Sequence, residues 1–293
     1  MSVGDWFRKF CVDIKVKDKE SISRRYKAIT RRLNTDYWNT TSDTSHSLYV
    51  GSYGRNTAVN GFSDLDMIFQ LPYSVYKKYN DYIGNGQSAL LQEVKRTIEK
   101  TYSKTSIRGD GQVILVPFTD GLIYEVVPAF INDNDSYTYP DANSGGRWRV
   151  TNPRPEILAI RTRNDQCNKN LVWLCRMMRV WKNKWEVPIG GLLVDTLAYQ
   201  FIETWKHRDK SFMYYDWMCR DFFDFMAKQD KEKAYWKAPG SGQSVYGKGL
   251  FQWKARRCCN IAIEACEHES ANPKREWSAK QKWREVFGNQ FPS

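Results

Sequence analysis

The sequence of 293 residues has no uninterrupted apolar run near the roughly 18 residues that a membrane-spanning helix needs. Its first ten residues, Met1 to Phe10, lack the apolar segment of a secretory signal peptide. Internal repeats and low-complexity tracts are also missing. The seven cysteines are odd in number and lie mostly in apolar segments, which indicates reduced thiols and not a disulfide framework. We therefore expect a cytoplasmic protein that is neither secreted nor inserted in a membrane.

Acidic residues are scarce beside basic ones, because 33 Asp and Glu face 45 Lys and Arg, a formal net charge of +12. This excess predicts a polyanionic partner, such as a nucleoside triphosphate, a nucleic acid or an anionic membrane. Hydrophobic residues make up 41% of the chain and include 12 tryptophans among the aromatic residues. That content argues against a disordered chain and indicates a well-packed protein with aromatic-lined pockets.

The order of hydrophobic patterns predicts a sheet lobe followed by a helical lobe. Strands are expected over 48–50 and 65–71, and a β-hairpin over 113–118 and 122–130. Helices are expected over 18–33, 90–102, 171–184, 192–206, 217–231 and 255–269. Asn132 to Pro155 is rich in Asn, Asp, Gly and Pro and should form a long loop. The fold class is therefore α+β, with one domain over 1–155 and a helical domain over 156–293.

The most informative stretch is a pair of aspartates, Asp64 and Asp66, at the start of the expected strand 65–71. Side chains alternate along a strand, so residues two apart lie on the same face. Two neighbouring carboxylates repel each other unless a cation lies between them, and an oxygen-only site suits Mg²⁺. Glu125 is a third candidate ligand, because it is a lone acid in an otherwise apolar strand, where a charge is costly unless paired or metal-bound.

A candidate phosphate-binding turn precedes the acids by about a dozen residues. Gly51 allows the backbone to approach a phosphate closely, and Ser52 can donate its hydroxyl and amide at the expected start of a helix. A phosphate-binding turn beside a metal site is what phosphoryl chemistry requires. Each motif alone is a weak signal, but their combination in this order indicates a functional site.

The combination of Gly51-Ser52, Asp64-x-Asp66 and a distant strand acid resembles the polymerase-β-like nucleotidyltransferase superfamily. More narrowly, Gly-Ser-Tyr-Gly-Arg-Asn-Thr-Ala-Val-Asn-Gly-Phe-Ser-Asp-Leu-Asp resembles the CD-NTases, the bacterial cyclic oligonucleotide synthases of CBASS anti-phage defence. These are relatives of cyclic GMP-AMP synthase and oligoadenylate synthase. The third acid is often Asp in the wider superfamily, whereas here it is Glu125.

The resemblance implies a bilobal protein with its active site in the cleft. Asp64, Asp66 and Glu125 would hold two Mg²⁺ ions, for which Mn²⁺ can substitute. Nucleotide contacts are implied for a further set of residues: Gly51, Ser52, Tyr53, Arg179, Lys182 and Thr196. Two alternatives without a nucleotide contact stay open. The basic helix face with Arg179 and Lys182 could simply be solvated, and the Thr196 hydroxyl could hydrogen-bond to its own helix.

The implied reaction polymerises nucleoside triphosphates such as ATP and GTP into a small cyclic oligonucleotide and releases pyrophosphate. A cyclic dinucleotide such as cyclic GMP-AMP is the expected product, and it would act on a separate effector. A regulatory protein or peptide is a candidate partner, a nucleic-acid activator stays open, and no membrane partner is expected. Two other functions share these residues: template-independent addition of nucleotides to RNA ends, and a non-catalytic nucleotide- or RNA-binding module.

Overall fold

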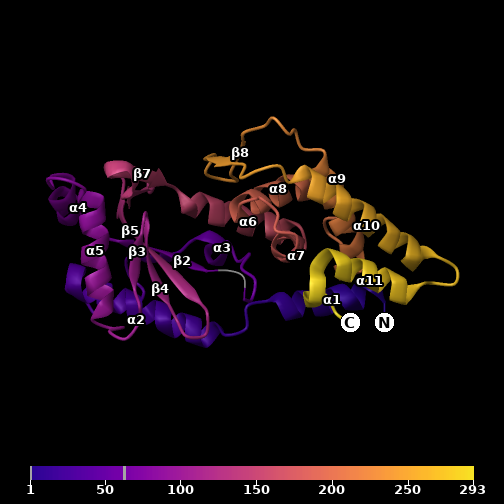
Figure 1. Ribbon diagram of the computed structural model, residues 1–293, viewed down its shortest axis with the longest axis horizontal. Coiled ribbons are helices and arrows are strands. Elements are labelled where there is room, and N and C mark those ends of the chain that lie inside the picture. The colour runs from indigo at the N-terminus through magenta and orange to yellow at the C-terminus, as the bar shows by residue number, and fades with distance from the viewer. Residues whose placement is uncertain (1, 62–63) are drawn as a thin grey trace. The chain divides into compact units, whose positions relative to one another are not determined.

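The computed structural model describes residues 2–61 and 64–293 (Figure 1). Phe62 and Ser63, which belong to the motif quoted above, lie outside the described residues. The chain forms two compact units. Unit 1 contains Met1–Val16, Arg55–Phe62 and Pro155–Ser293, and unit 2 contains Lys17–Gly54 and Ser63–Arg154. Two segments of the expected first domain, 1–16 and 55–62, are therefore grouped with the helical unit.

Unit 2 is built on a seven-stranded mixed sheet. Its strands are β1 Ser47–Tyr49, β2 Leu65–Gln70, β3 Arg108–Asp110, β4 Val113–Pro117, β5 Ile123–Ile131, β6 Tyr137–Asp141 and β7 Arg147–Thr151. The order is β1-β2-β5-β4-β3, and β6 pairs with the end of β5 and with β7. β2 and β5 run parallel, whereas the other pairs are antiparallel. The parallel pair at the centre of the sheet is the one that carries the acids.

Four helices belong to the described part of this unit: α2 Lys19–Trp38, α3 Gly51–Gly54, α4 Tyr73–Asn80 and α5 Gly86–Glu99, with a short 3₁₀ turn over Asn143–Gly145. α2 and α5 each have a buried face that is mainly apolar. α2 begins at Asp18, whose carboxylate accepts a hydrogen bond from the Ser21 amide at 3.0 Å. Its buried face includes Ile22, whose carbonyl oxygen accepts a hydrogen bond from the Tyr124 hydroxyl of β5 at 2.7 Å.

Unit 1 is mainly helical. Its elements are α1 Val3–Ile14, α6 Pro153–Gln166 (from Pro155 onward), α7 Asn170–Lys184, α8 Gly191–Thr204, α9 Tyr215–Ala227, β8 Tyr235–Lys237, β9 Ser244–Tyr246, α10 Gln252–Ser270 and α11 Glu276–Phe287. Short 3₁₀ turns cover Phe212–Tyr214 and Gly288–Gln290. Most residues of α7 are buried, and α1, α8 and α11 pack against it.

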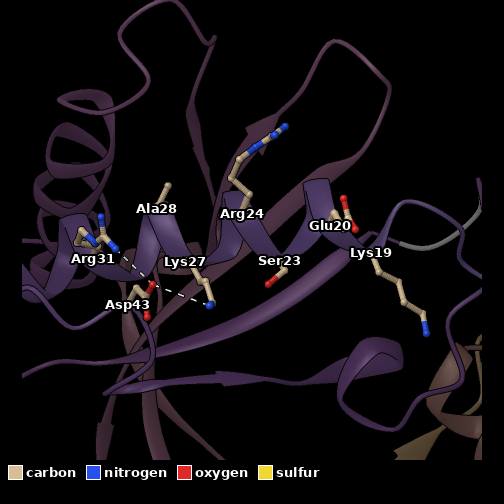
Figure 2. Close-up of a pocket in the computed structure, with 8 residues that line it drawn as sticks. All are labelled: Lys19, Glu20, Ser23, Arg24, Lys27, Ala28, Arg31 and Asp43. Carbon is tan, nitrogen blue, oxygen red and sulfur yellow. Dashed lines mark hydrogen bonds and ion pairs between the residues drawn. The ribbon is translucent and has the colours of Figure 1, made fainter.

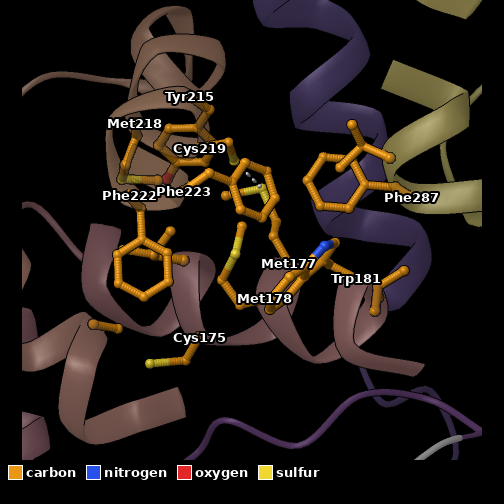
Figure 3. Packing of buried hydrophobic residues seen from close by; sticks show 14 of the residues in the cluster. Cys175, Met177, Met178, Trp181, Tyr215, Met218, Cys219, Phe222, Phe223 and Phe287 are labelled. Atoms are coloured by element: carbon orange, nitrogen blue, oxygen red, sulfur yellow. Dashed lines mark hydrogen bonds between the residues drawn. The ribbon is translucent and has the colours of Figure 1, made fainter. Parts of the chain in front are cut away.

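Aromatic and sulfur-containing side chains fill the core of unit 1. Figure 3 shows Met177, Met178 and Trp181 of α7 packed among side chains from α9 and Phe287 of α11. The first helix is part of this core, since the ring centroid of Phe7 lies 5.2 Å from that of Phe291. Buried apolar area of this kind is the main source of stability in a domain.

Most expected elements are confirmed, with one error. The hairpin is β4–β5, and the helices expected over 171–184, 192–206, 217–231 and 255–269 correspond to α7, α8, α9 and α10. The loop expected over 132–155 is wrong, because the segment forms the hairpin β6–β7 and the start of α6. Most of its Asn, Asp and Gly residues lie in the turns on both sides of β6, so the composition of the segment indicates the turns and does not indicate the short strands between them. No helix in the described ranges combines the length and apolarity needed to cross a membrane.

Candidate active site on the central parallel strands

Two of the three expected acids lie side by side. Asp66 on β2 is the register partner of Glu125 on β5. Neighbouring strands lie about 4.8 Å apart and partners in register point to the same face, so the two carboxyl groups meet. A hydrogen bond joins them. Asp64 comes directly before β2, one residue ahead of its first paired residue.

Two carboxyl groups of this cluster, those of Glu125 and Asp64, have raised pKa values, because both are partly buried and the neighbouring acids repel the charge of Glu125. Burial, then the negative charges of Asp66 and Asp64, raises the pKa of Glu125 to about 7. Burial also raises the pKa of Asp64. Within the described ranges, Glu125 forms no salt bridge with a lysine or arginine. The third acid is therefore close enough to the other two for its ionisation to depend on them.

The donor set fits a divalent cation. No group of three or more His, Cys, Asp or Glu side chains among the described residues is arranged tightly enough to enclose a metal ion as it stands. The pair Asp66–Glu125 is nevertheless in contact, and the charge of Asp64 acts on it. A bound cation would remove the repulsion that raises the pKa of Glu125, and oxygen ligands of this kind suit Mg²⁺.

The Gly51 turn lies directly against the acid pair. Gly51 has a φ of +56°, a conformation that glycine adopts without strain, and a Cβ at this position would lie 1.8 Å from Oδ2 of Asp66. The amide of Val50 donates a hydrogen bond to the Asp66 carbonyl oxygen at 3.0 Å, which ties the turn to β2. Ser52 is buried, and the expected helix after the turn is the single turn α3. The candidate phosphate turn and the candidate metal ligands are thus packed together.

Tyr53 lies close to the same acids. Burial, followed by the charges of Asp64 and Asp66, raises the pKa of its hydroxyl to about 12. The hydroxyl is therefore protonated at neutral pH, and its ring is half-buried beside the acid pair. A stacking role for this ring toward a nucleobase stays a prediction.

In unit 1, the structure places two of the expected nucleotide contacts inside the fold. The Thr196 hydroxyl is fully buried and donates to the Leu192 carbonyl oxygen at 2.8 Å, which is the own-helix bond that the sequence left open. Arg179 donates through Nη2 to Oδ2 of Asp195 at 2.7 Å and to the Gly191 carbonyl oxygen at 3.1 Å. Neither group is directed to solvent, so a triphosphate contact would require each to exchange an internal partner.

Lys182 is different, because its ammonium group has no such partner among the residues that the structure describes. Burial, then the charges of Arg179 and Lys248, lowers its pKa. The lysine lies on α7, one turn after Arg179, and is half-buried. A cation held among cations is a good receptor for a compact anion.

A buried ionic cluster in unit 1 was missed by the sequence reasoning. Asp195 is fully buried, and its Oδ2 accepts hydrogen bonds from Nε of Arg55 at 2.9 Å and from the Thr57 hydroxyl at 2.9 Å, in addition to that from Arg179. Burial alone would raise the pKa of Asp195, but the charges of Arg179 and Arg55 and the hydrogen bonds outweigh it, and the pKa lies below its usual value. Arg55 also lies 3.7 Å from Glu156. Arg55 and Thr57 are thereby fastened to α6, α7 and α8.

A basic hollow of about 570 Å³ lies along α2, away from the acids. Figure 2 shows Arg31 and Lys27 joined to Asp43, at 3.3 Å and 4.0 Å. The side chains of Lys19 and Arg24 extend away from Asp43, and in the described part of the chain neither forms an ion pair. The expected basic helix therefore keeps two unpaired cations at its surface, and its contact with a nucleic acid stays a prediction.

A mixed sheet with paired acids on its parallel strands, a Gly-Ser turn against them and a helical unit after it defines a polymerase-β-like nucleotidyltransferase fold. Residues 1–164 match the model of the Second Messenger Oligonucleotide or Dinucleotide Synthetase domain, more than half of the chain. The chain therefore belongs to this family and is a nucleotidyltransferase, a cyclic nucleotide synthase.

Relatives agree with this assignment. The chain is 23% identical over 278 residues to a probable cyclic nucleotide synthase of Bacillus cereus (strain VD146), covering 83% of this chain and 81% of that protein. It is similar to CdnC of Escherichia coli MS115-1 in a complex with HORMA-deltaN, with a TM-score of 0.69, 14% identity and coverage of 99% and 98%. It is also similar to the cyclic AMP-GMP synthase DncV of Vibrio cholerae with a linear intermediate, with a TM-score of 0.62, 15% identity and coverage of 84% and 69%. The expected α+β fold is confirmed.

Proposed function

We propose that this chain joins nucleoside triphosphates into a small cyclic oligonucleotide and releases pyrophosphate. The observation that carries the proposal is the contact between Asp66 and Glu125 on adjacent parallel strands, with Gly51 packed against them. A cyclic dinucleotide made from ATP and GTP, such as cyclic GMP-AMP, is the product we propose. It would serve as an anti-phage signal that acts on a separate effector.

Different residues of the chain would bind the metal ions and the phosphates. Asp64, Asp66 and Glu125 would hold two Mg²⁺ ions, which supply a lowered pKa for the attacking ribose hydroxyl and neutralise charge on the phosphates. Gly51 and Ser52 would bind the donor phosphates beside them, because the missing Cβ of Gly51 lets the turn pack directly on the Asp66 carboxylate. Catalysis then consists of alignment and electrostatics without a covalent enzyme intermediate.

Further nucleotide contacts are proposed in each unit by itself. Lys182 is the group we propose for the triphosphate, because it is half-buried among cations. Tyr53, beside the acids, would stack on a base. The internal hydrogen bonds of Arg179 and Thr196 support positioning roles for these two residues more than direct contacts.

A regulatory protein is the partner we propose for control of this activity. The support is the E. coli relative CdnC, which forms a complex with a HORMA protein and has also been solved with ATP. Family membership favours the cyclase over addition of nucleotides to RNA ends and over a non-catalytic binding module.

The test uses the purified chain with all four ribonucleoside triphosphates and Mg²⁺, followed by phosphatase treatment and mass spectrometry. A phosphatase-resistant product with the mass of a cyclic oligonucleotide is expected, and its mass identifies the bases. Asp66→Asn should lose the product because the isosteric amide cannot ligate as an anion. Asp133→Asn is the matched control, since Asp133 is exposed in the β5–β6 turn of the same unit. Product from Asp66→Asn at the level of the control would refute the assignment.

A further inference from the structure

A second lysine lies beside Lys182 at the start of α8. The loop after β9 carries Lys248, whose Cε would lie 3.7 Å from a Cβ placed on Gly190, the residue that precedes α8. The charge of Lys248 also acts on Lys182 of α7. Three elements of unit 1 that are far apart in sequence, α7, the start of α8 and the β8–β9 hairpin, therefore converge on one small region.

Two glycines hold the loop that carries Lys248 in place. The amide of Gly247 donates a hydrogen bond to the Ala234 carbonyl oxygen at 3.1 Å. On the other side, Gly249 has a φ of +153° and packs so closely on Pro188 that a Cβ would lie 2.9 Å from the proline Cβ. The loop is thus fastened immediately before and after Lys248, and the lysine's position follows from the fold of the hairpin.

Two cations in this region, Lys182 and Lys248, lack a counter-ion in the part of the chain that the structure describes. Arg179 is engaged by Asp195, so its charge is largely used inside the fold. Throughout the described residues, neither Lys182 nor Lys248 forms a salt bridge or a side-chain hydrogen bond. Like charges held together with no anion between them repel, and the cost rises when one of them is half-buried.

The start of α8 adds to the positive potential. Gly190, the residue before α8, has no side chain to satisfy the first amides of this 14-residue helix. The positive end of the helix dipole therefore lies beside Lys248, whose charge also acts on Lys182. A compact anion with several negative charges fits this arrangement better than a single carboxylate, because an ammonium group is a mobile point charge suited to phosphate oxygens.

We propose that Lys248 is a second polyphosphate-binding residue, which the β8–β9 hairpin delivers to the start of α8 and which grips the terminal phosphates of a nucleoside triphosphate together with Lys182. The inference rests on the proposed function, since it assigns a further ligand-binding residue to the same reaction. The base and ribose take no part in this contact, so affinity should follow the number of phosphates.

Binding is measured by calorimetry with EDTA present, so that no turnover occurs, using ATP, AMP and inorganic tripolyphosphate as probes. Lys248→Ala should weaken ATP and tripolyphosphate about tenfold, which equals about 1.4 kcal/mol. AMP should bind as it does to the wild type. Lys231→Ala is the matched control, because this exposed lysine precedes the same hairpin and its side chain forms no hydrogen bond or salt bridge among the described residues.

A second variant tests whether the position of Lys248, and not only its charge, matters for binding. Gly249→Ala keeps Lys248 but pushes its loop away from Pro188, and it should weaken tripolyphosphate in the same direction. Circular dichroism confirms that each variant is folded. Wild-type affinity of Lys248→Ala for tripolyphosphate, or an equal loss for AMP and ATP, would overturn the inference.

The two proposals fail in different ways. If the wild type makes no cyclic product while Lys248→Ala still weakens tripolyphosphate, the reaction is wrong and the polyphosphate site stands. If the wild type makes the product and Lys248→Ala binds every probe normally, the site is wrong and the reaction stands.

Discussion

The pKa of Glu125 links metal binding to pH. Burial and the charges of Asp66 and Asp64 raise this pKa from an ordinary 4.5 to about 7 in the metal-free protein. A raised pKa means that the folded state holds the proton more tightly than the unfolded state does. This group therefore favours the folded state at low pH, and its contribution is lost as the pH rises from about 4.5 to about 7.

A divalent cation must displace that proton. Below about pH 7, each unit of pH lowers the ionised fraction of Glu125 about tenfold, which corresponds to about 1.36 kcal/mol of binding free energy. Between pH 8 and pH 5 we expect the apparent affinity for Mn²⁺ to fall about a hundredfold from this group alone. Free Mn²⁺ can be followed by its electron paramagnetic resonance signal during titration at a series of pH values.

Glu125→Gln provides the decisive comparison. This variant should bind Mn²⁺ more weakly at pH 8 and should show little pH dependence between pH 8 and pH 6, because the titrating group is gone. Glu20→Gln, at an exposed position of the same unit, should follow the wild type. A wild-type affinity that is flat from pH 8 to pH 5.5, or a slope in Glu125→Gln equal to that of the wild type, would show that Glu125 is not a metal ligand.

Three substitutions test the packing inside the two units. Gly51→Ala should abolish product formation, because its Cβ would displace the Asp66 carboxylate, and should lower the free energy of unfolding in urea by about 1–2 kcal/mol from the left-handed backbone alone. An active Gly51→Ala enzyme would contradict this. Asp195→Asn should cost about 3–5 kcal/mol, since it leaves buried cations uncompensated. Arg55→Ala should cost a similar amount, and the double variant less than the sum; additive losses would mean that the two residues do not interact.

Local patterns were sufficient to predict most elements and the identity of the acids. The apolar runs of β2, β4 and β5 and the helical spacing of α7 depend only on neighbours in sequence. The pairing of β2 with β5 is a contact between residues about 60 positions apart, and nothing in the spacing specifies its register. The partnership of Asp66 with Glu125 was therefore a hypothesis from the residue types, since Glu125 is a lone acid in an apolar strand, and the sheet supplies the physical reason.

The helical unit was harder to predict in detail. Arg179 and Lys182 lie on the same basic helix in the sequence. In the structure Arg179 forms a salt bridge with Asp195, whereas Lys182 has no partner among the described residues. Asp195 bonds to Arg55, which lies 140 positions earlier, so no local pattern could separate the two cations. Lys248 lies in a loop whose position depends on Pro188, a contact that only the folded chain reveals.

The grouping of 1–16 with 155–293 has a consequence for synthesis on the ribosome. Unit 2 has all of its residues once position 154 has emerged, whereas α1 needs Phe287 and Phe291 to cover Phe10. The first helix to be made must therefore wait for the last one, with its apolar face uncovered in the meantime. A fragment that stops near residue 155 would keep the sheet, but its segments 1–16 and 55–62 would lack the rest of unit 1, to which they belong. Such a fragment is therefore a poor tool for studying this enzyme.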